Sequence, residues 1–135
     1  QIGKGVELKE GSDVTIVATG LMVSEALQAH EMLKAEGISA RVINIATIKP
    51  LDTEIIIKAA KETGAIVTAE EHSVIGGLGG AVAECVAEEY PVPVVKLGVN
   101  DEFGHSGPAV KLLDEFGLRA VNIAEKVKKA IALKK

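Results

Sequence analysis

Short apolar runs alternate with longer segments of helical periodicity along this chain of 135 residues. Runs of apolar and β-branched residues predict five strands, over residues 6–8, 14–20, 40–46, 66–69 and 94–99. Apolar residues spaced three and four apart predict five helices, over residues 23–33, 53–63, about 79–89, 108–116 and from 122 onward. This regular alternation predicts one α/β domain over residues 1–135, built as a three-layer α/β/α sandwich with right-handed crossovers.

Several helix boundaries carry local signals. Asp52 follows Pro50 and is placed to cap the helix over 53–63. Gly37 and Gly64 are expected to end their helices in a left-handed conformation. Asn122, with Glu125 three residues later, resembles the capping box that starts a helix. The strand over 14–20 is apolar nearly throughout, so we expect it to be buried on both faces at the centre of a parallel sheet.

Composition narrows the function classes. Apolar residues make up 47% of the chain, which is enough for a folded core, yet the aromatics are only Tyr90, Phe103 and Phe116. A net charge of -4 with interspersed Lys and Glu argues against a nucleic-acid or anionic-membrane partner. The lone Cys85 excludes an internal disulfide, is predicted to be a core residue, and fits a cytoplasmic location.

Neither a membrane-spanning segment nor a signal peptide is recognised in the sequence. Because the chain begins at Gln1 and not at Met, we expect it to be a piece of a longer protein. His30 lies beside an apolar helical stripe, and we interpret it as a hydrogen-bonded packing residue.

The densest group of titratable residues is Glu70-Glu71-His72, which follows the strand over 66–69 and precedes a glycine-rich helix start. The sequence predicts that this group forms a polar turn at the carboxyl end of its strand, where ligands bind in open α/β sheets. A phosphate cradle is disfavoured, because Gly77-Leu78-Gly79-Gly80-Ala81-Val82 is no G-x-G-x-x-G motif and two carboxylates would repel an anion. We interpret the glycines as a tight turn that permits close helix packing.

Other constellations are weak. Asp101, His105 and Ser106 are the residue types of a hydrolytic triad, but Ser106 lacks the G-x-S-x-G elbow. His72 and His105 lack the spacing that metal sites show. If Glu70 and Glu71 lie on a strand, they point to opposite faces and do not form an acid–base pair.

Several motifs occur in one order along nearly the whole chain. They are Lys4-Gly5, Val17-Ala18-Thr19-Gly20, Ile48-Lys49-Pro50-Leu51-Asp52, Thr68-Ala69-Glu70-Glu71-His72 with Gly76-Gly77-Leu78-Gly79, and Asp101-Glu102-Phe103-Gly104-His105-Ser106-Gly107 with Phe116-Gly117-Leu118. This ordered set resembles the C-terminal domain of transketolases. Related domains occur in deoxyxylulose-phosphate synthase and in the β subunit of 2-oxoacid dehydrogenase E1 components.

The resemblance implies a five-stranded mixed sheet in which the strand over 6–8 is an antiparallel edge strand. It also implies that residues 20–24 lie beside residues 70–79, where the strand order reverses. In such enzymes thiamine diphosphate and Mg²⁺ bind between the other two domains, across a dimer interface. No Gly-Asp-Gly metal motif is present here, so we expect no catalytic, cofactor-binding or metal-binding residue in this chain.

The leading hypothesis is therefore a supporting C-terminal domain of a thiamine-dependent transketolase, which transfers a two-carbon ketol unit between sugar phosphates. Its partners would be the preceding thiamine-binding domains or subunit, within a homodimer. Alternatives are the corresponding domain of the synthase or of the E1 β subunit, or a free-standing module that binds a small ligand. A crevice for a partner, regulator or ligand is predicted from residues at the strand-order reversal and in the 100–107 loop: Gly20, Ser24, Glu70, Glu71, His72, Gly76, Gly77, Gly79, Phe103, His105 and Ser106.

Overall fold

The computed structural model describes residues 4–46, 48–73, 77–99, 113 and 117–134. The strands are β1 (Val6–Lys9), β2 (Val14–Ala18), β3 (Ala40–Asn44), β4 (Ile66–Ser73) and β5 (Val94–Val99). The helices within the described residues are α1 (Met22–Ala35), α2 (Thr53–Thr63), α3 (Leu78–Glu89) and α5 (Ala120–Ala132). The fold is α/β, as the sequence pattern predicts.

The sheet has five strands in the order β1-β3-β2-β4-β5. β1 pairs with β3 in antiparallel fashion, whereas β2, β3, β4 and β5 pair in parallel. The expected mixed sheet with one antiparallel edge strand is therefore confirmed. From β2 the chain moves to β3 on one side and then returns past β2 to β4, so the strand order reverses between β2 and β4.

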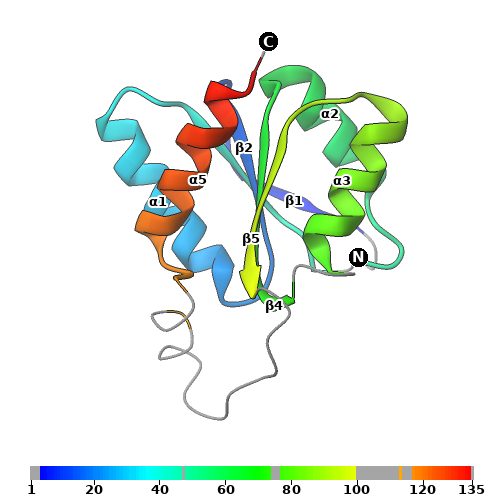
Figure 1. Ribbon diagram of the computed structural model, residues 1–135, viewed down its shortest axis with the longest axis horizontal. Helices are drawn as coiled ribbons and strands as arrows, with labels where there is room; N and C mark the ends of the chain where they lie inside the picture. The colour runs from blue at the N-terminus through cyan, green and yellow to red at the C-terminus, as the bar shows by residue number, and fades with distance from the viewer. Residues whose placement is uncertain (1–3, 47, 74–76, 100–112, 114–116, 135) are drawn as a thin grey trace.

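Helices cover both faces of the sheet (Figure 1). α1 and α5 lie together on one face, where Leu33, Ile123 and Val127 belong to one buried cluster with residues of β2 and β4. α2 and α3 lie on the other face, where Ile56 and Val82 belong to a second cluster. All five residues of β2 are buried, because helices cover both faces of this central strand. These layers form the predicted α/β/α sandwich.

Several helix ends lie where the capping residues in the sequence predict them. The Asp52 carboxylate accepts a hydrogen bond from Ile55 N at 3.4 Å and so caps α2, as expected. Gly37 and Gly64 follow α1 and α2 with φ of 81° and 77°, in the left-handed region. His30 Nδ1 lies 2.7 Å from the Ala40 carbonyl oxygen, which confirms a packing histidine.

Other boundaries differ from the sequence prediction. β4 extends to Ser73, so Glu70, Glu71 and His72 lie on a strand and not in a polar turn. β3 ends at Asn44 and α3 begins at Leu78, both close to the expected positions. α5 begins at Ala120 and not at Asn122, because the Asn122 side chain accepts a hydrogen bond from the Arg119 backbone N–H at 2.8 Å, one turn earlier.

The predicted helix over 108–116 falls almost wholly outside the described residues. Leu113 is buried, and its carbonyl accepts a hydrogen bond from Leu118 N at 2.7 Å across Gly117, which has φ of 66°. This arrangement is typical of a helix end. No helix in the described part of the chain is both long and apolar enough to cross a membrane.

Candidate functional site

Glu70 lies near the carboxyl end of β4 and is completely buried. Its Oε1 accepts a hydrogen bond from Leu78 N and its Oε2 one from Gly79 N, each at 2.8 Å. The first N–H groups of a helix have no partner within the helix, and they attract negative charge. Glu70 therefore satisfies the start of α3 with both of its oxygens, and an anion bound there would have to displace this buried carboxylate.

Glu71 points to the opposite face of the sheet, as alternation along a strand requires. It is half-buried, and its Oε1 accepts a hydrogen bond from Leu21 N at 3.0 Å, at the start of α1. Gly20 precedes that contact with φ of 59°, and a Cβ at Gly20 would collide with the Glu71 carboxylate. The positive φ favours glycine at this position, and a Cβ would also require the Glu71 carboxylate to move.

Carboxylates also accept hydrogen bonds at the starts of the other described helices, α2 and α5. α2 begins at Asp52, whose second oxygen also accepts a hydrogen bond from Gly5 N at 2.8 Å. α5 begins against Glu25 of α1, whose Oε1 accepts a hydrogen bond from Ala120 N at 2.9 Å. Each helix in the described ranges thus starts against a carboxylate, and three of these carboxylates come from a different element.

The structure brings together part of the predicted crevice. Gly20 and Glu71 meet at the reversal of strand order, and Glu70 holds Leu78 and Gly79 on the other face. Ser24 is exposed on α1 and Gly77 precedes α3. The prediction also names residues about which the structure says less: His72 is described only by its backbone, and Gly76, Phe103, His105 and Ser106 lie outside the described residues.

At the start of α3, the backbone N–H groups of Leu78 and Gly79, which could otherwise bind a phosphate, already donate hydrogen bonds to Glu70. Within the described ranges, His, Cys, Asp and Glu side chains form no group of three that could hold a metal ion. The Asp101, His105 and Ser106 constellation lies outside the described residues.

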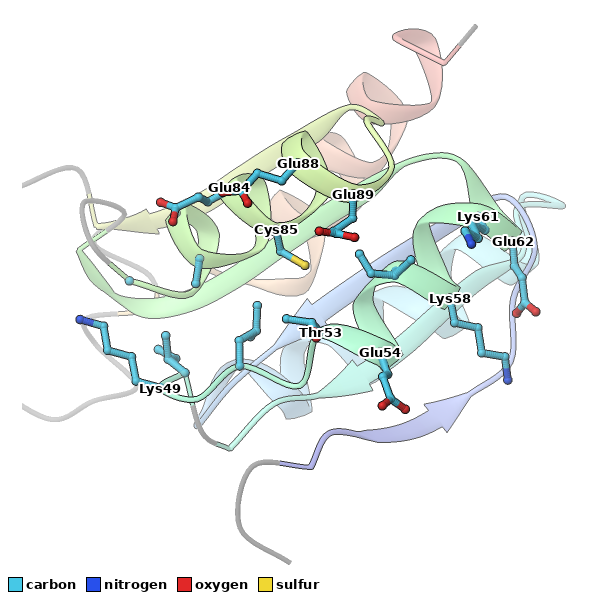
Figure 2. A pocket seen from close by; sticks show the side chains of 16 residues that line it. Lys49, Thr53, Glu54, Lys58, Lys61, Glu62, Glu84, Cys85, Glu88 and Glu89 are labelled. Carbon is cyan, nitrogen blue, oxygen red and sulfur yellow. The ribbon is translucent and has the colours of Figure 1, made fainter.

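An open groove of about 1220 Å³ lies between α2 and α3 (Figure 2). Half-buried apolar side chains, including Ile57 and Leu51, line it together with Cys85. Burial and the carboxylates of Glu89 and Glu88 raise the pKa of the Cys85 thiol above its ordinary value. This thiol is therefore protonated at neutral pH and is not an activated nucleophile.

Sequence reasoning missed two charged residues inside the fold. Glu25 caps a helix 95 positions away, and no local signal marks it. Arg41 is buried on β3; it forms an ion pair with Glu62 at 2.7 Å and donates a hydrogen bond from Nε to the Gly11 carbonyl at 3.1 Å. The signal that could have found Arg41 is its place in the apolar run over 40–46, because a buried charge requires a partner.

The fold and the site define one class of domain. It is an open α/β sandwich with this strand order, in which carboxylates accept hydrogen bonds from the backbone N–H groups at the helix starts. The family described as "Transketolase, C-terminal domain" matches residues 3–123. The chain belongs to this family, as its ordered motifs indicate.

Relatives place the domain within larger proteins. The chain is 53% identical over 122 residues to a 6-deoxy-6-sulfo-D-fructose transketolase subunit of Clostridium sp. (strain MSTE9), which covers 90% of this chain and 38% of the relative. It is 48% identical over 124 residues to a 1-deoxy-D-xylulose-5-phosphate synthase of Heliobacterium modesticaldum, covering 91% of this chain and 19% of that protein.

A solved structure described as a split-gene transketolase in an inactive beta4 tetramer is also similar. It has a TM-score of 0.94 and 57% identity, and the match covers 100% of this chain and 44% of that one. This chain therefore spans less than half the length of each of these proteins.

Proposed function

We propose that this chain is the C-terminal supporting domain of a thiamine-diphosphate-dependent transketolase. The complete enzyme would transfer a two-carbon ketol unit between sugar phosphates in the cytoplasm, with its catalytic centre in preceding domains or in a separate subunit. The similarity to a transketolase subunit over 90% of this chain supports the transketolase assignment. The match covers only 38% of that subunit, which supports a role as one domain of a longer protein.

One observation carries the supporting role. The two carboxylates at the reversal of strand order, Glu70 and Glu71, both accept hydrogen bonds from helix starts. A general acid or base must reach the reacting group, and a buried carboxylate held by two backbone N–H groups cannot do so. Through these hydrogen bonds the two residues instead join β4 to α1 and α3.

We also propose that the complete enzyme is a homodimer or a larger assembly of such chains, because the split-gene relative forms a beta4 tetramer. We propose that the rim of the crevice, formed by the exposed Ser24 and the half-buried Glu71, contacts the preceding domains or a regulator. This rim lies at the carboxyl edge of the parallel strands, where open α/β sheets make functional contacts.

Isothermal titration calorimetry tests the absence of a cofactor site. The isolated chain is titrated with thiamine diphosphate in the presence of Mg²⁺, and then with Mg²⁺ alone as the control. The proposal predicts no saturable heat in either titration. Saturable binding with a dissociation constant of about 1 μM to 100 μM contradicts it, because such an affinity requires a formed site.

A second candidate is the corresponding domain of a 1-deoxy-D-xylulose-5-phosphate synthase, because the Heliobacterium relative is 48% identical. The two candidates share the supporting role and differ in the product of the complete enzyme. Assaying the complete enzyme separately for ketol transfer between sugar phosphates and for formation of 1-deoxy-D-xylulose 5-phosphate distinguishes them.

A further inference from the structure

Asp52 makes its shorter hydrogen bond to the residue that leads into β1, and not to the helix that it caps. Its Oδ2 accepts a hydrogen bond from Gly5 N at 2.8 Å, whereas its Oδ1 lies 3.4 Å from Ile55 N. Backbone N–H groups usually donate at about 2.7–3.2 Å, so the contact with Gly5 is the stronger one. We propose that Asp52 is a positioning residue, which fixes how the polypeptide that enters at Gly5 is attached to this domain.

β1, which follows Gly5, contributes little to the core. All four of its residues are exposed, and among the described residues none of these four belongs to either buried cluster. β1 pairs with β3 at the edge of the sheet, and the register of this pair shifts between Glu7 and Lys9. Because little apolar surface is buried here, polar contacts with the rest of the domain decide how firmly β1 is held.

Two charged side chains provide such contacts. Within β1, the Glu7 Oε1 atom lies 3.6 Å from Nε of the buried Arg41. Before β1, Asp52 accepts the hydrogen bond from Gly5 N. Asp52 is held in place by α2, which it caps and whose Ile56 is completely buried. The Asp52 contact therefore connects the entering polypeptide to the core through α2.

The backbone at Gly5 also passes close to apolar side chains. A Cβ added there would lie 2.6 Å from Ile45 Cδ1 and 3.1 Å from Ile55 Cγ2. Ile45 is buried in the second cluster, and Ile55 packs against that cluster. Glycine leaves the space for this approach, so packing and the hydrogen bond to Asp52 together restrict the path of the chain at Gly5.

This inference rests on the proposed function, because it names a residue through which a supporting domain is attached to the preceding domains. A domain that lies outside the reactive centre affects turnover through its orientation toward the catalytic domains. Loss of the Asp52 contact reduces the fraction of molecules in which this domain is correctly oriented, while the remaining molecules bind and react normally. The expected effect on the complete enzyme is therefore on kcat and not on KM.

Asp52→Ser separates the two contacts of Asp52. Serine is as good a helix cap as aspartate, so Ile55 N keeps an acceptor, but a single short hydroxyl group is not expected to reach Gly5 N as well. The matched control is Asp13→Ser. Asp13 is half-buried like Asp52, and its Oδ2 accepts a hydrogen bond from Ser39 N at 2.7 Å. Asp13 precedes β2, at the opposite edge of the sheet from Gly5.

Hydrogen exchange measured by NMR follows the Asp52 contact in this chain. In Asp52→Ser the Gly5 amide is expected to exchange at least about tenfold faster than in wild type, because a hydrogen bond to a carboxylate is lost. The urea midpoint is expected to stay close to the wild-type value, since α2 keeps its cap. Asp13→Ser is expected to leave exchange at Gly5 unchanged.

Two measurements on the complete enzyme follow the consequences. Trypsin cleavage after the exposed Lys4 is expected to become at least about tenfold faster in Asp52→Ser, as measured by mass spectrometry of the fragment that begins at Gly5. The kcat for ketol transfer is expected to fall at least about twofold, with an unchanged KM for xylulose 5-phosphate. Asp13→Ser is expected to match wild type in both measurements.

Unchanged exchange at Gly5 in Asp52→Ser overturns the inference, as does an equal effect of Asp13→Ser, which would indicate general destabilisation. Faster exchange with an unchanged kcat also overturns it, because Asp52 would then hold the chain without positioning the domain. A complete wild-type enzyme that shows no ketol transfer contradicts the proposed function instead, and exchange and cleavage at Gly5 then decide the inference alone. The two failures are therefore distinguishable.

Discussion

Replacing Glu70 with glutamine tests whether the carboxylate at the end of β4 is structural. The side chain is completely buried, and its two oxygens each accept a hydrogen bond of 2.8 Å from the start of α3. Glutamine keeps one acceptor oxygen but turns an NH₂ group toward the other backbone N–H. One charge-assisted hydrogen bond is lost, which costs about 1.5 to 3 kcal/mol, and a buried N–H donor is left without a partner.

The loss of negative charge at the helix start costs up to about 2 kcal/mol more. The lower cost of burying a neutral amide offsets part of this loss. We therefore expect Glu70→Gln to lower the free energy of unfolding by about 3 kcal/mol. In urea titrations followed by circular dichroism, the midpoint is then expected to fall by about 1 to 2 M with an unchanged slope.

Glu71→Gln is the matched control, since it is the same substitution one residue further along the strand. Glu71 is half-buried and makes one described hydrogen bond, to Leu21 N at 3.0 Å. Its replacement is expected to cost less than about 1 kcal/mol, because water can solvate the donor that it leaves. A Glu70→Gln variant within about 0.5 kcal/mol of wild type, or two variants of equal cost, would refute the structural assignment.

Three further perturbations follow from single contacts. Thr68→Val is expected to raise the free energy of unfolding by about 1 kcal/mol in urea titrations, because the buried Thr68 hydroxyl has no hydrogen-bond partner among the described residues; a destabilised variant contradicts this. Gly11→Ala is expected to lower the free energy of unfolding by about 1 to 3 kcal/mol, because the added Cβ would collide with the backbone of Arg41. An unchanged thermal midpoint contradicts this. Cys85 is expected to react with iodoacetamide at pH 8 more slowly than a free thiol, because burial and then Glu89 raise its pKa, and faster after Glu89→Gln. The stability that this raised pKa contributes to the folded chain is present below the thiol's pKa in the unfolded chain, and it is lost as the pH rises through the thiol's pKa in the folded chain.

The sandwich and most of its strands could be predicted because their signals are local. The apolar run at β2 and the Asp52 cap each depend on a few adjacent residues. The extension of β4 to Ser73 could not be predicted in that way. Glu70 and Glu71 are compatible with a strand only because helix starts from other parts of the fold satisfy their carboxylates.

The same reason explains what was missed at the candidate site. Glu71 contacts a residue 50 positions away and Glu25 one 95 positions away, so neither contact leaves a spacing pattern in the sequence. The α2–α3 groove depends on two helices that a strand separates in the chain.

We propose that the reactive centre lies outside this chain. The most direct measurement is the rate of ketol transfer from xylulose 5-phosphate, with thiamine diphosphate and Mg²⁺ supplied, for the isolated chain and for the complete enzyme under the same conditions. We expect turnover by the complete enzyme and none above background for the isolated chain. Turnover by the isolated chain would contradict it.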